Sequence, residues 1–493
     1  MADRGRAGRV EVEVEGGWIG ASVDDAGDVG TFGGYTVAVD GRPSNLRALT
    51  AEQAARGSGA QTVSEVLCAI FGEIGVEQGL SRIEGSVALI VWDAAKRELW
   101  AIRDRVGARP MFWRQGPDGV AAGSAPEAVG SGPVDVLAMD RLSRVGLLPP
   151  PCSVIEGVRR VPAGCLVRIG AAAAPSRWWD TPATVPGSGG SLARWVQSLE
   201  YSARMCVRHA AAAAQAVWVE DAPGLAVLAA AEHPVTGRLP ALVIDVAGRE
   251  RIPDPEGAAS VRRVALGPDH LDEALDDLAG LDEPVVDPDA LLWWAIGRAA
   301  AQEDFAGVMT GRGSEAWLEP ATPRFLLRAI RLRPGAADAT PRCPEVDAIL
   351  SAAPTTPPGA GWLQRRLTVP DRTLRTADLV GASAGVSFVA PLCDPRLVQF
   401  GCTVPLGHHR GIAPRLWAAM GARSAGPVRA TVPLAAWLAG PCAGLLEGVP
   451  ERLTRFVEPS SLGRWPPRLE GSEAVAERVF GLLVLERWLR GRS

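Results

Sequence analysis

Acidic side chains occupy two places in the sequence where they could act together. Glu220 and Asp221 directly follow the apolar run Ala216–Val219, and Glu315 closes the glycine-rich stretch Thr310–Glu315. Carboxylates bind Mg²⁺ in proteins, usually alongside the phosphate oxygens of a substrate. If the two places meet in the fold, Glu220, Asp221 and Glu315 predict an acidic metal site. The alternative prediction is a solvated loop without a ligand.

Other residue types exclude several kinds of site. The eight cysteines are scattered and form no C-x-x-C pair, which excludes a clustered zinc or redox motif. Lys96 is the only lysine, so no mechanism can draw a lysine from elsewhere in this sequence. We expect no metal site at the pair His408-His409.

The composition indicates a globular protein. The chain has 493 residues, of which 47% are hydrophobic, and this apolar content excludes intrinsic disorder. Its 51 basic and 56 acidic residues give a net charge of −5, without the basic excess of a nucleic-acid-binding domain. No run approaches the ~18 apolar residues of a membrane helix, and no signal-peptide pattern is visible. We therefore expect a cytoplasmic protein that binds neither nucleic acid nor a membrane.

The first part of the chain reads as short strands and turns. Alternation predicts a strand at 10–14, and a second strand at 35–39 is expected to close at the turn pair Asp40-Gly41. Helical spacing covers 62–75, and a hairpin is predicted from the strands 86–92 and 98–103. A stretch rich in Pro, Gly and Ser at 182–190 has the composition of a linker.

Strands and helices alternate after this linker. We expect a helix at 191–214, strands at 216–219, 239–246 and 305–310, and a further helix at 290–301. Such alternation favours a parallel sheet covered by helices on both faces. From about residue 321 the sequence is mainly helical, and it ends in an amphipathic helix over 473–490.

Several motifs along the chain are similar to those of the asparagine synthetase family. Gly85–Asp93 and Ala101–Pro110 resemble the G-x-F-A-F-A-x-W-D and A-R-D-R-x-G-x-K-P segments of that family's glutaminase half. Further markers follow in the family's order: Asp40-Gly41, Asn45–Arg47, Ser153–Gly164, Arg177–Asp180, Glu283–Ala290, Thr310–Glu315, Pro391–Val398, Pro433–Leu438 and Leu483–Arg490. Their shared order makes the resemblance specific, although no single motif is. The family includes β-lactam synthetases and lasso-peptide macrolactam cyclases.

The resemblance implies an α/β protein of two domains. Residues 1–182 would form a glutaminase-like, N-terminal-nucleophile α/β/β/α domain. Residues 183–493 would form a doubly wound α/β domain of the ATP-pyrophosphatase type with a helical C-terminal extension. The crevice at the carboxyl ends of the parallel strands is then expected between residues 219–226 and 310–316.

The resemblance also implies chemistry that this sequence no longer supports in its first domain. The family's glutaminase attacks glutamine with a cysteine at position 2, where this chain has Ala2. The family's N-G-E motif, which holds glutamine, reads Asp40-Gly41-Arg42. We expect no glutaminase activity.

The family's nucleotide site is altered in the same way. Relatives cradle pyrophosphate with S-G-G-x-D-S at a helix N-terminus, and after Val219 this motif is replaced by residues that include Glu220, Asp221 and Gly224. Thr310 and Gly311 begin the segment that matches a second family element, S-G-E-G-x-D-E, on the same site. Carboxylates beside phosphate oxygens repel them, and Pro223 removes an N–H donor. The resemblance therefore implies a vestigial nucleotide site, with Glu315 as the remaining candidate metal ligand.

Three further positions bear on the activity that the resemblance implies. Asp378 matches an acid that orients substrate in some members, which makes it a candidate catalytic residue; a helix cap or ion pair is the alternative. Val389 stands where relatives place an arginine, and Arg429 stands near a family lysine that is missing.

The favoured interpretation is a degenerate family member that acts as a binding or partner subunit in peptide or natural-product biosynthesis. The first alternative is an active ATP-dependent amide- or macrolactam-forming enzyme with an atypical nucleotide site, which would need ATP and Mg²⁺. The second is a new acidic metal site. Expected partners are a peptide or an intact synthetase paralogue, in a homo- or heterodimer.

Overall fold

The computed structural model describes most of the chain and divides it into two compact units. The described residues are 9–14, 17–22, 27–117, 119–170, 173–181, 189–232, 237–318, 358–422, 430–447, 453–455, 469 and 472–492. Unit 1 comprises Met1–Asp135 and Pro150–Asp180, and unit 2 comprises Val136–Pro149 and Thr181–Ser493. Within the described ranges, no helix is long and apolar enough to cross a membrane.

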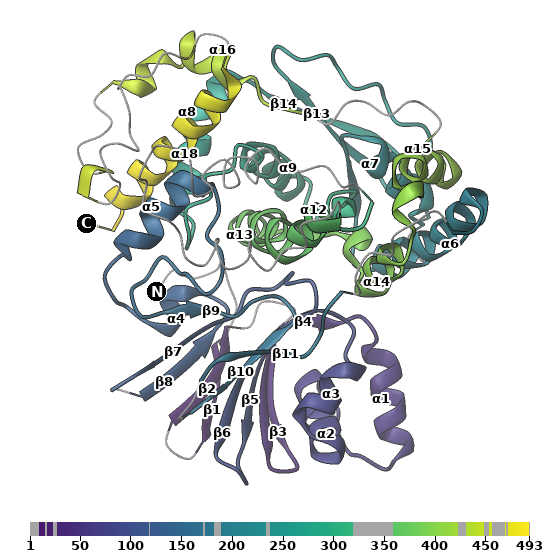
Figure 1. Ribbon diagram of the computed structural model, residues 1–493, viewed down its shortest axis with the longest axis vertical. Helices are drawn as coiled ribbons and strands as arrows, with labels where there is room; N and C mark the ends of the chain where they lie inside the picture. The colour runs from purple at the N-terminus through teal and green to yellow at the C-terminus, as the bar shows by residue number, and fades with distance from the viewer. Residues whose placement is uncertain are drawn as a thin grey trace. The chain divides into compact units, whose positions relative to one another are not determined.

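Unit 1 is built on an antiparallel sheet of six strands (Figure 1). In spatial order these are β11 (Pro175–Arg177), β10 (Cys165–Ile169), β6 (Glu98–Arg103), β5 (Gly85–Asp93), β4 (Tyr35–Pro43) and β3 (Asp28–Phe32). A three-stranded sheet of β8 (Gly119–Gly123), β7 (Phe112–Gly116) and β9 (Arg159–Arg160) belongs to the same unit, as does the pair β1 (Arg9–Val14) and β2 (Gly17–Ser22). The predicted hairpin of β5 and β6 is confirmed.

Alternation of side chains along β4 fills two hydrophobic cores. Val37 and Val39 pack with α1 (Leu46–Ala55), α2 (Val63–Ile74) and α3 (Val76–Arg82), whereas Ala38 packs with Trp113 of β7. Helices therefore cover one face of the large sheet and the small sheet lies on the other. The expected fourth, helical layer is represented in the described part of unit 1 by α4 (Pro126–Val129) alone, which packs on β7 and β8.

The expected turn at Asp40-Gly41 is wrong. β4 continues through both residues to Pro43, which pairs with Gly85 of β5. Gly41 has φ +92°, and a Cβ there would lie 2.3 Å from the carbonyl oxygen of Ser86. Glycine is thus needed for a close approach of two paired strands and not for a chain reversal.

Unit 2 contains a five-stranded sheet whose strands are all parallel, as predicted. The order is β14 (Val261–Leu266), β13 (Ala241–Val246), β12 (Ala216–Val219), β15 (Gly307–Thr310) and β16 (Ser387–Val389). α9 (Ala290–Gln302) and α13 (Leu374–Ala384) lie on one face, and α7 (Ala222–Ala230) with α6 (Leu192–Ala211) and α15 (His409–Met420) on the other (Figure 1).

The remaining elements of unit 2 are mainly helical. They are α5 (Val136–Val145), η1 (Pro268–His270), α8 (Leu271–Ala279), η2 (Ser314–Ala316), α12 (Pro358–Leu363), the π-helix η3 (Gln364–Thr373), η4 (Pro391–Cys393), α14 (Pro395–Cys402), η5 (Leu406–His408), α16 (Leu434–Ala439), η6 (Ala443–Leu446), η7 (Leu453–Arg455) and α18 (Glu473–Arg490). The last of these coincides with the helix predicted at 473–490.

The division into units differs from the predicted boundary between residues 182 and 183. The chain passes into unit 2 at Thr181, and it also contributes Val136–Pro149 to unit 2 before returning to unit 1. The reason is α5, whose side chains Met139 and Leu142 are buried and whose helix packs against α18. A single cut in the sequence cannot describe this excursion.

Candidate functional site

The carboxyl ends of β12 and β15 form the topological switch point of the parallel sheet. From β12 the chain moves outward through β13 to β14, and then returns to the other side of β12 for β15 and β16. Ligands of open α/β sheets bind at such a point, because the loops leaving the two strands diverge there. The segments 219–226 and 310–316 leave β12 and β15 at this point.

A buried ion pair fills the space between the two strand ends. The guanidinium of Arg312 donates from Nε to Oε1 of Glu220 at 2.5 Å and from Nη2 to Oε2 at 2.9 Å. Its third nitrogen, Nη1, donates to Oδ2 of Asp289 at 3.0 Å. Both side chains of the pair are 2% exposed. The solvated loop is therefore wrong for Glu220.

Two tryptophan rings hold the guanidinium in place. The Arg312 Cζ lies 4.5 Å from the ring centre of Trp218 on β12 and 5.1 Å from that of Trp293 on α9. The two rings contact each other edge to face. Cation–π contacts of this kind stabilise an arginine that is withdrawn from water. Arg312 is thus fixed on one side by a carboxylate and on the other by aromatic rings.

The N-terminus of α7, where relatives would cradle phosphate, is filled by this chain itself. Asp221 is the N-cap, and its Oδ1 accepts the backbone N–H of Gly224 at 2.9 Å. Pro223 has no N–H to offer. The backbone of Gly311 lies against this turn so closely that a Cβ on Gly311 would be 2.4 Å from the nitrogen of Gly224.

The other predicted residues of the site face inward or bond locally. Val219 and Thr310 are buried at the strand ends, and the Thr310 hydroxyl accepts the N–H of Arg312 at 3.2 Å. Oε2 of Glu315 accepts the N–H of Gly313 at 2.8 Å. Among the residues that the structure describes, no three His, Cys, Asp or Glu side chains are grouped to hold a metal ion.

These contacts decide whether a nucleotide fits the residues that are present. A pyrophosphate needs free backbone N–H donors and room at the start of α7. Here the N–H of Gly224 already donates to Asp221, and the backbone of Gly311 fills the space beside it. The Glu220–Arg312 ion pair occupies the crevice between the strand ends. The arrangement does not fit the phosphates of ATP.

Asp378 lies in a second buried ion-pair group beside the first. Its Oδ2 accepts from Nη1 of Arg375 at 2.9 Å, and Nε of Arg375 donates to Oε2 of Glu283 at 2.7 Å. The side chain of Asp378 is 4% exposed. One turn earlier, Arg372 binds Asp287. Asp378 is therefore engaged by an arginine on its own helix, which matches the ion-pair alternative.

These ion pairs also hold the loop Glu283–Ala290, one of the segments that resemble the asparagine synthetase family. Glu283 and Asp287 belong to the segment Glu283–Ala290, and both bind arginines of the helix that continues from η3 into α13. Asp289, at the end of this segment, binds Arg312. The loop thus joins that helix to the ends of β12 and β15.

The altered glutaminase positions in unit 1 are only partly described. Ala2 lies outside the described residues. Asp40 forms an ion pair with Arg109 at 3.7 Å. Cys68 is buried beside β3 and β4, and burial raises the pKa of its thiol to about 12. A thiol that remains protonated at neutral pH is a poor nucleophile, so Cys68 is not a candidate nucleophile.

The remaining candidates contribute little to the site. Val389 is partly buried in β16, and Arg429 lies outside the described residues. His409 places Nε2 3.0 Å from the carbonyl oxygen of Val404, and burial lowers the pKa of its imidazole. His408 contacts the carbonyl oxygen of Gly190.

Sequence reasoning missed the residue at the centre of the site, Arg312. It stands between two glycines in Thr310–Glu315, a segment in which only Glu315 was predicted as a metal ligand. The signal that could have revealed it is the joint presence of a new acid after β12 and a new cation after β15. Opposite charges placed at adjacent strand ends are expected to pair.

Comparisons with known proteins find similarity over part of this chain. Residues 29–179 match the model of a glutamine amidotransferase domain. A putative glutamine-hydrolysing asparagine synthetase of Mycobacterium bovis is 34% identical over 98 residues, which are 18% of this chain and 15% of that protein. Asparagine synthetase 3 of Bacillus subtilis is 27% identical over 157 residues, 30% of this chain and 25% of that protein.

Solved structures give a weaker likeness. Glutamine phosphoribosylpyrophosphate amidotransferase from Bacillus subtilis aligns at 15% identity with a TM-score of 0.22, covering 37% of this chain and 40% of that one. This score supports no conclusion about the fold. The matched segments of the curated relatives span a quarter of their length or less.

The family match in unit 1 agrees with the motifs quoted from the sequence. Taken together, they show that this chain is similar, over part of its length, to glutamine-hydrolysing asparagine synthetases.

Proposed function

We propose that this chain is a degenerate member of the asparagine synthetase family that no longer activates a carboxylate with ATP. It acts instead as a binding or partner subunit in peptide or natural-product biosynthesis, beside an intact synthetase or a peptide. One observation carries the proposal: Arg312 and Glu220 form a buried two-bond ion pair at the switch point of the parallel sheet, where a substrate would have to enter.

Electrostatics and space both support this loss of activity. The Glu220–Arg312 pair satisfies its own charges, so it offers no net positive field to a triphosphate. The carboxylate of Asp221 sits on the helix N-terminus that would attract an anion, and it would repel phosphate oxygens there. Restoring a phosphate site would require at least three changes, at Glu220, Asp221 and Arg312.

Calorimetric titration of the full-length chain with Mg-ATP tests the proposal. We expect no saturable heat up to about 1 mM nucleotide and no rise in the unfolding temperature, because a ligand binds the native state only where it fits. A pyrophosphate-release assay with candidate carboxylate and amine substrates should stay at background.

The competing function would give a distinct result. Micromolar binding of Mg-ATP that is lost in the Glu220→Leu/Arg312→Leu variant, or pyrophosphate release above background, would show an active amide- or macrolactam-forming enzyme with an atypical nucleotide site. Asp254, exposed and far from the switch point in sequence, supplies a control through Asp254→Ala, which should give the same result as the unmodified chain in every assay.

A further inference from the structure

The outer face of α6 carries an apolar centre that the described residues leave uncovered. Tyr201 is 69% exposed and Met205 is 47% exposed, four residues further along the same helix. Gln197, four residues before Tyr201, is also exposed. Residues at this spacing lie above one another on a helix. Gln197, Tyr201 and Met205 therefore form one stripe, with two large side chains in contact with solvent.

An arginine stands at each end of this stripe. Arg194 precedes Gln197 by three residues and Arg208 follows Met205 by three, so both lie on the same face. Both are exposed, and neither forms an ion pair with any residue that the structure describes. Along the helix axis the two positions are about 21 Å apart at 1.5 Å per residue. The face is thus cationic at both ends and apolar in the middle.

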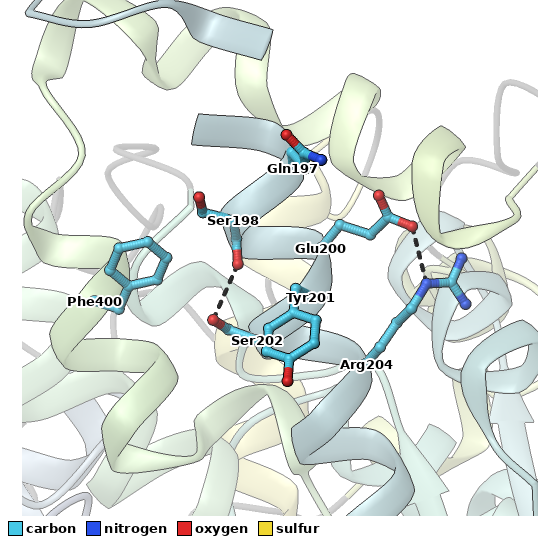
Figure 2. Close-up of a pocket in the computed structure, with 7 residues that line it drawn as sticks. All are labelled: Gln197, Ser198, Glu200, Tyr201, Ser202, Arg204 and Phe400. Carbon is cyan, nitrogen blue, oxygen red and sulfur yellow. Dashed lines mark hydrogen bonds and ion pairs between the residues drawn. The ribbon is translucent and has the colours of Figure 1, made fainter. Parts of the chain in front are cut away.

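A pocket of about 570 Å³ opens at the middle of this face. Figure 2 shows Ser198 and Ser202 on the side of α6 nearer to Phe400 of α14, and Glu200 with Arg204 on the opposite side. The Glu200 carboxylate binds Arg204 at 2.9 Å, so the acid of this face is already neutralised. The volume is within the range that admits a large side chain of a ligand.

We propose that this face of α6 binds an acidic amphipathic segment of a partner protein. The segment would place an apolar side chain against Tyr201 and Met205, and carboxylates against Arg194 and Arg208. Charge complementarity selects this occupant: a basic segment would be repelled at both ends, and an uncharged one would leave both arginines unpaired. The inference rests on the proposed role as a partner subunit and names the chemistry of the partner.

The test uses the full-length chain and a designed probe. The probe is a fluorescent helical peptide of about 20 residues, with leucines at the centre of one face and glutamates at both ends of that face. Fluorescence anisotropy should show micromolar binding that weakens several-fold between about 50 and 300 mM NaCl, because the charges are exposed to solvent. The same peptide with lysines in place of the glutamates should not bind.

Variants locate the binding on α6. We expect Arg194→Glu/Arg208→Glu and Tyr201→Ala each to weaken binding of the acidic peptide at least about tenfold. The neutral pair Arg194→Gln/Arg208→Gln should weaken it less. The control Arg47→Glu/Arg238→Glu makes the same charge change at other exposed sites and should leave binding unchanged. If charge reversal impairs folding, the neutral pair and Tyr201→Ala still decide the question.

Three outcomes would overturn this inference: no binding of the acidic peptide up to about 1 mM, equal binding of the lysine peptide, or binding that the α6 variants leave intact. A dimer in sedimentation experiments that Tyr201→Ala disperses would mean that a second copy covers this face, and would also overturn it. Mg-ATP binding measured on the same preparations reports on the proposed function alone.

Discussion

At the scale of single residues, the most informative feature is the buried ion pair of Glu220 and Arg312 at the ends of β12 and β15. Glu220 and Arg312 satisfy each other with two hydrogen bonds, and Trp218 and Trp293 cover the guanidinium. Removing two charges from water is costly, and the pair recovers that cost only while both members are present. The pair therefore helps to maintain the native structure.

Removal of one member should therefore be far more damaging than removal of both. We expect Arg312→Leu to lower the free energy of unfolding by about 3–5 kcal/mol, because it leaves the Glu220 carboxylate buried without its cation. Glu220→Leu/Arg312→Leu should recover most of that loss, since two apolar side chains of similar size need no partners. Urea unfolding followed by tryptophan fluorescence measures both.

The exposed pair Asp394–Arg396 provides the control for this experiment. Arg396→Leu should change the free energy of unfolding by less than about 1 kcal/mol, because water solvates the remaining charge. Equal losses in the single and the double variant at the buried site would contradict a paired role for Arg312 and Glu220.

At the scale of elements, the start of α7 shows how a helix terminus can be closed to anions. A helix N-terminus presents unsatisfied N–H groups and a partial positive charge. Asp221 provides a carboxylate to this terminus from within the chain, and Pro223 removes one of the donors. The helix is stabilised by the same interaction that makes the terminus unavailable to an external phosphate.

Asp221→Ala should destabilise α7 by about 0.5–2 kcal/mol, because the N–H of Gly224 loses its acceptor. Hydrogen exchange should become faster in the first turn of α7, while α9 on the other face of the sheet keeps its protection. Asp221→Asn is the matched control: an asparagine oxygen still caps the helix, so its stability should stay close to that of the unmodified chain. Equal losses in both variants would contradict the capping role.

At the scale of the whole molecule, the two compact units are interleaved in sequence. Val136–Pro149 leaves unit 1, supplies α5 to unit 2 and returns. Buried side chains on α5, including Met139 and Leu142, are part of unit 2 through the packing of α5 with α18. A fragment that ends near residue 180 would carry α5 without the helix on which it packs.

Leu142→Ala should consequently destabilise unit 2 and spare unit 1. We expect a loss of about 2–5 kcal/mol, as for other buried leucines replaced by alanine. Hydrogen exchange should rise in α18, at Glu473–Arg490, and remain unchanged in β5 and β6. Leu137→Ala, at a position of α5 that is 64% exposed, is the control and should alter neither unit. Faster exchange in β5 and β6 would show that α5 belongs to unit 1.

The sequence by itself determined much of the local structure and indicated the family. Alternation and helical spacing within single segments predicted the hairpin of β5 and β6, the parallel strands of unit 2 and the terminal helix, because the buried face of each element is encoded in its own residues. The order of motifs predicted the relationship to asparagine synthetases, which the family match supports. The two acids after β12, Glu220 and Asp221, are also evident from the sequence.

Only the tertiary structure decided what those altered residues do. Glu220 and Arg312 are 92 residues apart in sequence, and so are Glu283 and Arg375. No periodicity connects such positions. The parallel sheet brings the first pair together by placing the ends of β12 and β15 side by side, and the second pair forms where the loop before α9 meets α13. The path of β4 through Gly41 and the transfer of α5 to unit 2 have the same cause, since both depend on contacts with partners distant in the chain.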